Sequence, residues 1–232
     1  MQESVLRKSY LLFGEFDLSG EQLDAILVTH EHIDHTKSLA TLSNKYNIPI
    51  YATLKTWGAL NDISNKICEC NKKYFKTLED FKIGDFKIFP FPVPHDAADP
   101  CGFNISNSNK KISIATDLGY ISEELLEHFK KSSSILLEAN YDPDILKCSR
   151  YPYILKQRIS SKSGHLSNLS AGKAISSLYK FGLENALLVH LSKENNFPEL
   201  AYETVIGELS SCENIHLDVA PRNNPSKLFE VS

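Results

Sequence analysis

The chain has 232 residues, 42% of them hydrophobic and 23% charged, a composition typical of a folded protein with a full core and not of a disordered or fibrous one. Its formal net charge of -4 excludes a globally basic nucleic-acid coat but leaves a local basic patch open. No apolar run reaches the roughly 18 residues that span a membrane, and Met1–Leu12 lacks the apolar core of a signal peptide. We therefore expect a cytoplasmic protein.

Short apolar segments followed by turn residues predict strands, and segments with helical spacing predict helices between them. In chain order the predicted strands are Leu23–Val28, Ile48–Ala52, Phe86–Val93, Gly102–Ser106, Lys111–Ala115, Ser134–Glu138 and Ala186–His190. The predicted helices are Lys37–Tyr46, Ser122–Lys131, Ser170–Phe181 and Pro198–Leu209. Asn107–Asn109 predicts a hairpin turn. Since no linker or repeat divides the chain, the pattern predicts one domain over residues 1–232, of α/β or α+β class with mixed sheets.

Polar side chains follow the ends of several predicted strands. His30 comes after Val28, and His95, Asp117 and His190 each come at or just after the end of another strand. Loops at strand ends, held by a rigid sheet, commonly carry catalytic groups. These positions are therefore the first candidates for a functional site.

The segment His30–His35 is the strongest local signal in the sequence. Three His and one Asp at its fixed spacing arise by chance in fewer than about one in a thousand chains of this composition. Imidazole and carboxylate ligands suit zinc, manganese or iron. On a loop, His30 and His32 can face one metal ion while Asp34 and His35 face a second, and two ions about 3.5–4 Å apart can share a bridging water. The alternative is a polar loop with capping histidines.

His95, Asp117 and His190 can complete a ligand set for two metal ions. Each alone could be a hydrogen-bonded histidine or a capping aspartate. Beside the first motif we expect them to be ligands, because a two-metal site needs about seven protein ligands. We expect His128 and His216 to be surface or packing residues.

The five cysteines do not form a recognisable disulfide framework, since their number is odd and their spacing irregular. Cys68-Glu69-Cys70 could belong to a metal clip, but no second Cys or His pair lies near it in the sequence. We expect reduced thiols.

Several segments together resemble the metallo-β-lactamase superfamily and, within it, the YycJ/VicX (WalJ) family. The resemblance covers nearly everything from Leu23 to Leu228. The segments that carry it are Leu27–His35, Tyr46–Ala52, His95–Pro100, Ala115–Tyr120, Leu137–Asn140, Gly164–Asn168 and His190–Asn196. This resemblance implies an αββα sandwich of mixed sheets with outer helices.

The resemblance also implies two divalent metal ions, zinc or manganese with iron as a further option, and a metal-bridging hydroxide as the nucleophile. One ion would be held by His30, His32 and His95. The other would be held by Asp34, His35 and His190, with Asp117 bridging the two and Asp34 also counted as catalytic. The family is reported to include nucleases with 5′ exonuclease activity on DNA.

The N-terminal part of the chain departs from the family pattern. Family members begin with a Gly/Ser-rich strand segment and then a strand that ends in an Asp supporting the metal loop. About 22 residues precede Leu23 here, and neither feature is present. We expect Leu11–Leu18 to be the tail of a connecting helix and the domain to be shortened at its N-terminus.

Gly164–Asn168 is a second informative segment. It is similar to a Gly-His-Ser segment of metallo-β-lactamase-fold ribonucleases that places a histidine near the scissile phosphate. By that resemblance His165 would be catalytic, protonating the leaving oxygen or holding the phosphate. A backbone amide of Ser167 or Asn168, at a helix start, could bind an anion. The alternative is that these two residues only cap the helix and His165 is incidental.

Residues 147–165 carry five basic residues and no acidic residue. Basic groups can neutralise backbone phosphates, and Tyr151 and Tyr153 could stack on unpaired bases. The alternative is a solvated helix face with core tyrosines. The candidate phosphate ligands are Arg150, Lys156, Arg158 and, after His190, Lys193.

Three functions remain open on the sequence. The leading hypothesis is a two-metal phosphodiesterase that acts on DNA, from a 5′ end. The second is a small-ester or thioester hydrolase of the same fold, similar to glyoxalase II, which would turn over a thioester without nuclease activity. The third is an inactive regulatory or binding fragment, which would be poor in metal. A secreted β-lactamase is not expected, because we find no export signal.

Overall fold

The structure, a computed structural model, describes residues 19–222, 224 and 226. It divides into two compact units: the first contains the described residues up to Pro92 and Ala97–Cys101, and the second contains Val93–Asp96 and the residues from Gly102 onward. The predicted helical tail at Leu11–Leu18 lies outside the described residues. The organisation of residues 1–232 as one shortened domain stays a prediction.

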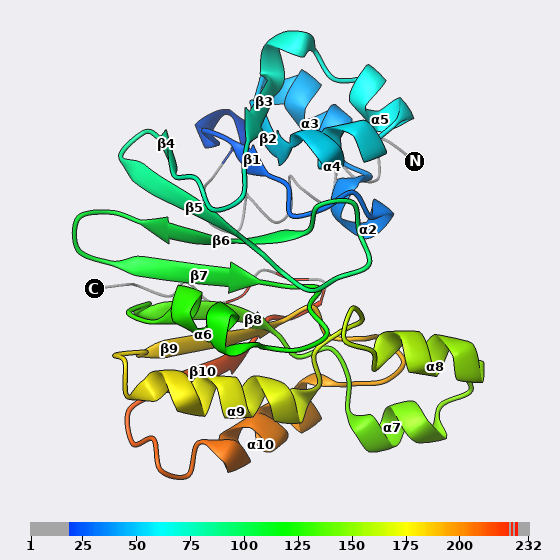
Figure 1. The fold of residues 1–232 in the computed structure, drawn as a ribbon, viewed down its shortest axis with the longest axis vertical. Helices are drawn as coiled ribbons and strands as arrows, with labels where there is room; N and C mark the ends of the chain where they lie inside the picture. Colours follow the sequence, from blue (N-terminus) through cyan, green and yellow to red (C-terminus); the bar gives the residue numbers. More distant parts are fainter. Residues whose placement is uncertain (1–18, 223, 225, 227–232) are drawn as a thin grey trace. The chain divides into compact units, whose positions relative to one another are not determined.

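The first unit contains a parallel sheet with strand order β1-β2-β3 and an antiparallel hairpin of β4 and β5, drawn from blue to green in Figure 1. The described strands of this unit are β1 Ile26–Leu27, β2 Ile50–Thr53, β3 Lys72–Phe75, β4 Phe81–Ile83 and β5 Phe86–Pro92. Its helices are η1 Gly20–Gln22, α2 Ile33–Thr36, α3 Leu39–Tyr46, α4 Leu54–Ala59, α5 Asp62–Asn65 and η2 Glu69–Asn71.

The core of the first unit forms between the parallel sheet and its helices. Ile50 and Ala52 on β2 are fully buried, and they share a cluster with Trp57 of α4 and Leu39 of α3. The Trp57 indole Nε1 donates to the Lys73 carbonyl at 2.9 Å, which satisfies the one polar atom of that ring. This packing fixes β1, whose end leads into the His30–His35 segment.

The second unit contains a mixed sheet with strand order β10-β9-β8-β7-β6. All neighbours are parallel except β6 and β7, which form an antiparallel hairpin. Its strands are β6 Cys101–Ser106, whose first residue belongs to the first unit, β7 Lys111–Ala115, β8 Ser134–Glu138, β9 Asn185–Val189 and β10 His216–Val219. Its helices are α6 Glu123–Phe129, α7 Pro143–Cys148, α8 Tyr153–Ile159, α9 Asn168–Tyr179 and α10 Pro198–Glu208.

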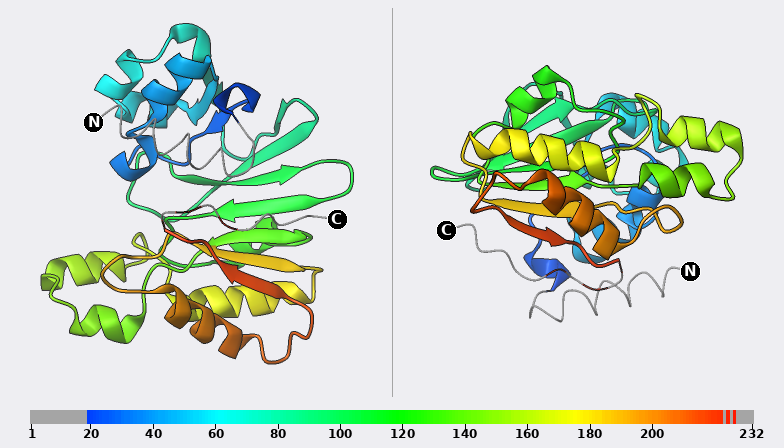
Figure 2. Two further views of the ribbon diagram at one scale, coloured as in Figure 1. Left: turned by 180° about the vertical axis from the view of Figure 1, so that it is seen from behind. Right: turned by 90° about the horizontal axis from the view of Figure 1, so that it is seen from below.

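Strand β8 is the best-covered strand of this sheet. Ile135 and Leu137 are fully buried, as expected of a short, nearly continuous apolar run in a parallel sheet. Ser167 caps the start of helix α9, since its hydroxyl accepts from the Ser170 amide, and α9 packs along α10 (Figure 2). The contact is close, because a Cβ on Gly172 would lie 2.9 Å from Cγ of Glu208.

The predicted hairpin turn at Asn107–Asn109 is confirmed. The Asn107 side-chain oxygen accepts from the Asn109 and Lys110 amides at 3.0 and 2.9 Å, which explains why an asparagine begins this turn. All five cysteines are free thiols, as expected. Within the described part of the chain, no helix has both the length and the apolar character required to cross a membrane.

Candidate metal centre

The predicted site residues lie where the sequence pattern places them, at the ends of strands. His30 follows β1, His95 follows β5, Asp117 follows β7 and His190 follows β9. Asp117 and His190 have positive φ angles of 55° and 58°, so the chain turns sharply where each side chain leaves its strand. The positions of Asp117 and His190 are therefore set by a rigid strand and a sharply bent backbone.

The first unit contributes a cluster of imidazole rings. The His30 ring centroid lies 4.6 Å from that of His32 and 4.4 Å from that of His35. His30 is buried, and its Nδ1 lies 3.0 Å from the Thr29 hydroxyl. Asp34 is the most exposed of these predicted ligands, with 61% of its side chain accessible, and its Oδ2 lies 3.5 Å from Nε2 of His35.

A single helical turn creates this cluster. Residues 33–36 form α2 and not an extended loop, so His35 folds back toward His30. The Thr36 hydroxyl donates to the carbonyls of Glu31 and His32 at 3.1 and 2.9 Å. The Glu31 carboxylate in turn accepts from the Ala98 amide at 2.9 Å. Hydrogen bonds from the Thr36 hydroxyl and from the Ala98 amide thus hold the His30–His35 segment in place.

The second unit gathers its predicted ligands around Asp117. The buried Asp117 Oδ1 lies 3.7 Å from Nε2 of His95, 3.7 Å from Nε2 of His190 and 3.7 Å from Nδ1 of His165. One carboxylate oxygen therefore faces three imidazole nitrogens at equal distance. In this unit the structure brings together Asp117, His95, His165 and His190.

Glu138, at the end of β8, joins the same group. Its Oε1 lies 2.8 Å from Nδ1 of both His165 and His190. Its Oε2 accepts from the amides of Leu118 and Leu166 at 3.0 and 3.2 Å. A fully buried carboxylate with four donors fixes both imidazole rings and their tautomers.

The charges of these groups reinforce one another. Burial alone would raise the pKa of the Glu138 carboxyl, but the hydrogen bonds from His165 and His190 hold that pKa below its usual value. Burial alone would lower the pKa of His165, but its hydrogen bond to Glu138 and the charge of that carboxylate raise it. Burial lowers the pKa of His95 in spite of Asp117, which favours a neutral imidazole able to act as a ligand.

Glu138 is the functional candidate that the sequence analysis missed. Like His30 and Asp117 it stands at the end of an apolar strand, and this position was the signal that could have found it. The strand prediction included Glu138 as its last residue, so the carboxylate was counted as part of the sheet.

One side-chain and one backbone contact hold the His95 and His165 loops together. His95 Nδ1 lies 3.0 Å from the Gly164 carbonyl, and the Asp96 amide donates to the Ser163 carbonyl at 3.2 Å. At Gly164 itself, a Cβ would lie 2.2 Å from the Arg158 carbonyl oxygen, so the end of α8 leaves room only for glycine.

Ser167 and Asn168 are accounted for by packing. The Ser167 hydroxyl caps α9, and Asn168 is fully buried, with its amide donating to the Tyr141 carbonyl and its side chain paired with Asn196 at 3.0 and 2.8 Å. The Ser167 side chain thus caps the helix and the Asn168 side chain belongs to the core, while anion binding by a backbone amide of either residue stays a prediction.

The basic candidates differ in their surroundings. The Lys156 ammonium donates to the Lys147 carbonyl at 2.7 Å, and Arg158 Nε donates to Asp96 at 2.6 Å, a bond that raises the pKa of Arg158. These two side chains therefore tie α8 to neighbouring segments. Arg150 and Lys193 are exposed.

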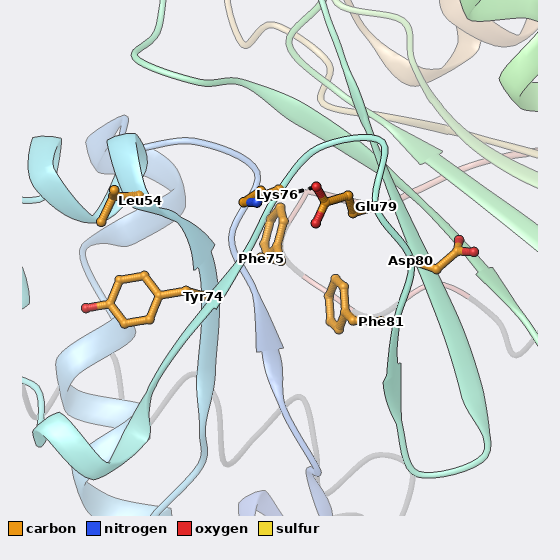
Figure 3. A pocket seen from close by; sticks show the side chains of 7 residues that line it. All are labelled: Leu54, Tyr74, Phe75, Lys76, Glu79, Asp80 and Phe81. Atoms are coloured by element: carbon orange, nitrogen blue, oxygen red, sulfur yellow. Dashed lines mark hydrogen bonds and ion pairs between the residues drawn. The ribbon is translucent and has the colours of Figure 1, made fainter.

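A separate pocket in the first unit contains none of the predicted site residues (Figure 3). Its lining carries three aromatic rings and two carboxylates against a single lysine, so it does not suit a polyanion. The lining residues are Leu54, Tyr74, Phe75, Lys76, Glu79, Asp80 and Phe81.

The donor set fits a divalent transition metal. Asp117 Oδ1 faces Nε2 of His95 and Nε2 of His190, and carboxylate oxygen with imidazole nitrogen is a combination that zinc, manganese and iron accept. Because Nδ1–H of His190 donates to Glu138, the lone pair of that ring lies on Nε2, the atom that faces Asp117.

Comparison with known proteins gives concordant matches in sequence. Residues 14–191 match the family model described as the beta-lactamase superfamily domain. The chain is 37% identical to exodeoxyribonuclease YycJ of Bacillus anthracis, over 84% of this chain and 74% of the relative. It is 36% identical to exodeoxyribonuclease WalJ of Streptococcus pneumoniae, over 89% of this chain and 78% of the relative.

Solved structures agree on the fold. The metallo-beta-lactamase fold protein YhfI from Bacillus subtilis aligns with a TM-score of 0.65 at 18% identity, covering 88% of this chain and 78% of that one. The predicted fold class is therefore confirmed. This fold implies divalent metal ions, and the chain has a His/Asp site for them.

Proposed function

We propose that this chain, which belongs to the YycJ/WalJ family of the beta-lactamase superfamily, is a metal-dependent exodeoxyribonuclease that degrades DNA from a 5′ end. Two relatives at 36–37% identity are named exodeoxyribonucleases. The chain covers about three quarters of each relative, so the likeness extends well beyond the metal motif. A DNA substrate also agrees with the expected cytoplasmic location.

The observation that carries the proposal is the Glu138–His165 pair beside Asp117. His165 Nδ1 is bound to a buried carboxylate, and this partner raises the pKa of the ring, so His165 can hold a proton and give it up at Nε2. Cleavage of a phosphodiester expels an alkoxide, a poor leaving group that needs such a proton. A thiolate, with a thiol pKa of about 8.5, leaves without one. The pair therefore favours a phosphodiesterase over a thioester hydrolase.

For the metal ligands we propose the seven residues expected from the sequence: His30, His32, Asp34, His35, His95, Asp117 and His190. Asp117 fits a bridging role, since its Oδ1 is equidistant from Nε2 of His95 and of His190. When bound, two divalent ions supply an activated water and stabilise charge on the phosphate. Glu138 orients His190 as a ligand and His165 as the proton donor.

We propose that the exposed Arg150 and Lys193 contact backbone phosphates of the DNA. Each such contact releases counterions, so it strengthens binding without reading the base sequence. Lys156 and Arg158 contribute to the same basic region, and their internal bonds also hold α8 in place.

The proposal is tested by incubating purified protein with 5′- and 3′-labelled DNA, single-stranded and duplex, in Mn²⁺ or Zn²⁺. We expect nucleotides to be released from the 5′ end. EDTA and His30→Ala should each abolish release, because both remove the metal centre. His165→Ala should lower kcat by about 10²–10⁴-fold, the usual contribution of a positioned proton donor.

Two controls make the assay decisive. His216→Ala, an exposed histidine on β10, should cleave as the wild type does. A thioester substrate is assayed in parallel. Thioester turnover without DNA cleavage would replace the proposal by the esterase hypothesis, and inactivity on both substrates in every metal would favour the regulatory fragment.

A further inference from the structure

Beside the proposed proton donor, the second unit exposes an aromatic ring and a cation as a pair. Tyr120 lies three residues after Asp117, and 43% of its surface is accessible. Lys162 lies three residues before His165 and is exposed. The Lys162 ammonium is 5.9 Å from the centroid of the Tyr120 ring. The two side chains therefore form one surface patch, here called the Tyr120–Lys162 platform.

The platform is held in place by backbone contacts. A Cβ on Gly119 would lie 2.3 Å from the Ser161 carbonyl oxygen and 2.4 Å from the Lys162 carbonyl, so the two loops touch where only glycine fits. The Gly119 amide also donates to the Pro94 carbonyl at 3.0 Å. The backbone at both residues is thus fixed before any ligand arrives, with the ammonium over the ring, which lowers the entropic cost of binding.

The distance from the platform to the reacting groups suits a nucleic-acid strand. Three residues of extended chain span at most about 11 Å, so Tyr120 and Lys162 lie within that distance of Asp117 and His165 along the backbone. A stacked strand advances roughly 3.4 Å per nucleotide. A strand with its scissile phosphate at His165 therefore places a base about one to three nucleotides away within reach of Tyr120.

We propose that the Tyr120–Lys162 platform is a nucleotide subsite, with Tyr120 stacking on a base of single-stranded DNA and Lys162 contacting the adjacent phosphate. This inference deepens the proposed exodeoxyribonuclease function and rests on it. A ring face accepts any base, so the subsite binds without sequence preference and requires the base to be unpaired. The enzyme therefore favours single-stranded or frayed ends over paired ends.

Binding and cleavage are measured separately, so that the subsite is tested even if the protein does not cleave. A single-stranded oligonucleotide carries 2-aminopurine near its 5′ end and phosphorothioate linkages that slow hydrolysis, and its fluorescence reports stacking on the protein. An oligonucleotide with an abasic residue at the same place offers the phosphate without the base. Wild-type protein is compared with Tyr120→Phe, Tyr120→Ala, Lys162→Arg and Lys162→Gln.

We expect Tyr120→Ala to weaken binding of the base-bearing strand about ten-fold and to raise KM in cleavage by a similar factor, the low end of what one stacked base contributes. Tyr120→Phe keeps the ring and should bind as the wild type does. Neither change should affect the abasic strand. Lys162→Gln should weaken both strands and lower the salt dependence of binding by about one ion, while Lys162→Arg should not.

Tyr202→Ala on α10 and Lys173→Ala on α9 are the matched controls, since both are exposed side chains of the same unit. The inference is overturned if Tyr120→Ala binds the base-bearing strand as well as the wild type, or if it loses affinity for both strands equally. DNA cleavage without Tyr120-dependent fluorescence would contradict the proposed subsite and leave the proposed nuclease function standing. Tyr120-dependent fluorescence without cleavage would contradict the proposed nuclease function and leave the subsite standing.

Discussion

A single carboxylate supports two different functions at this site. Glu138 binds the ring of His190, a proposed metal ligand, and the ring of His165, the proposed proton donor, through the same oxygen. Its other oxygen binds two backbone amides. Because all four donors are at or near the buried site, a substitution at this one position disturbs metal binding, proton transfer and folding together.

Glu138→Gln is predicted to lower both stability and activity. A glutamine offers one acceptor oxygen in place of two, so two of the four donors lose their partner at a cost of about 1–3 kcal/mol each. We expect a loss of about 3 kcal/mol, seen as a fall in Tm of roughly 6–12 °C, and a loss of activity of about 10–100-fold. Thermal unfolding and the DNA-cleavage assay measure the two effects.

The matched control is Glu184→Gln. Glu184 is an exposed residue that pairs with Lys110 at 3.4 Å, and a surface pair of this kind contributes little. Its Tm should stay within about 2 °C of wild type. Equal melting temperatures for the two variants would show that the Glu138 hydrogen bonds do not stabilise the fold.

The metal-ligand candidates could be predicted from the sequence because a polar residue marks the end of each apolar strand segment. His95, Asp117 and His190 each interrupt an apolar run, and the His30–His35 spacing is rare. For Glu138 the strand-end position was the only signal in the sequence, and it is a weak one, since a glutamate that ends a strand is ordinary until its four donors are seen. The donors come from three other segments, at residues 118, 165–166 and 190, which only the folded chain brings together.

At the scale of elements, long apolar strands and amphipathic helices were predicted well. Strands β7 and β8 have the predicted bounds, and α6, α9 and α10 lie within two residues of prediction at each end. Short or polar elements were missed: α4, α5, α7, α8, β3 and β4. In β3, Lys72, Lys73 and Tyr74 face outward in part and mask the strand pattern, so parallel pairing with β2, and not propensity, forms it.

Gly164→Ala is predicted to displace the loop that carries His165. The new methyl group would overlap the carbonyls of Arg158 and Ile159, at 2.2 and 2.3 Å. The loop must move, which breaks the 2.8 Å bond from the His165 amide to the Ile159 carbonyl. We expect unfolding in urea to show a loss of about 1–3 kcal/mol, with a loss of cleavage activity that exceeds this change in stability.

Gly207→Ala provides the opposite control. Gly207 lies in α10, and a Cβ there meets nothing within 4 Å. Alanine should stabilise this helix by about 0.5–1 kcal/mol and leave cleavage unchanged. If both alanines behaved alike, the close packing at Gly164 would not control the position of His165.

At the scale of the whole molecule, metal binding is predicted to stabilise the folded chain. A cation held by the proposed ligands binds only the folded chain, because the unfolded chain does not gather those side chains. With Mn²⁺ or Zn²⁺ at about 100 times its Kd, we expect a gain of about 2.7 kcal/mol, or roughly 5–11 °C in Tm. EDTA should reverse the gain.

The control for this effect compares histidines proposed as metal ligands with a histidine that is not. His30→Ala and His190→Ala should respond weakly to metal, whereas His216→Ala should respond as the wild type does. Metal content by mass spectrometry supplies the stoichiometry. A melting temperature that no divalent metal changes would contradict the assignment of these residues as ligands.

The positive φ angles of Asp117 and His190 have a consequence for the evolution of the chain. A left-handed backbone costs a residue with a side chain roughly 1–2 kcal/mol, whereas glycine adopts it freely. Directed evolution for heat resistance alone would therefore favour glycine at these two positions, and the protein would lose two proposed metal ligands. The proposed ligand roles of this aspartate and this histidine therefore come at a cost in the stability of the fold.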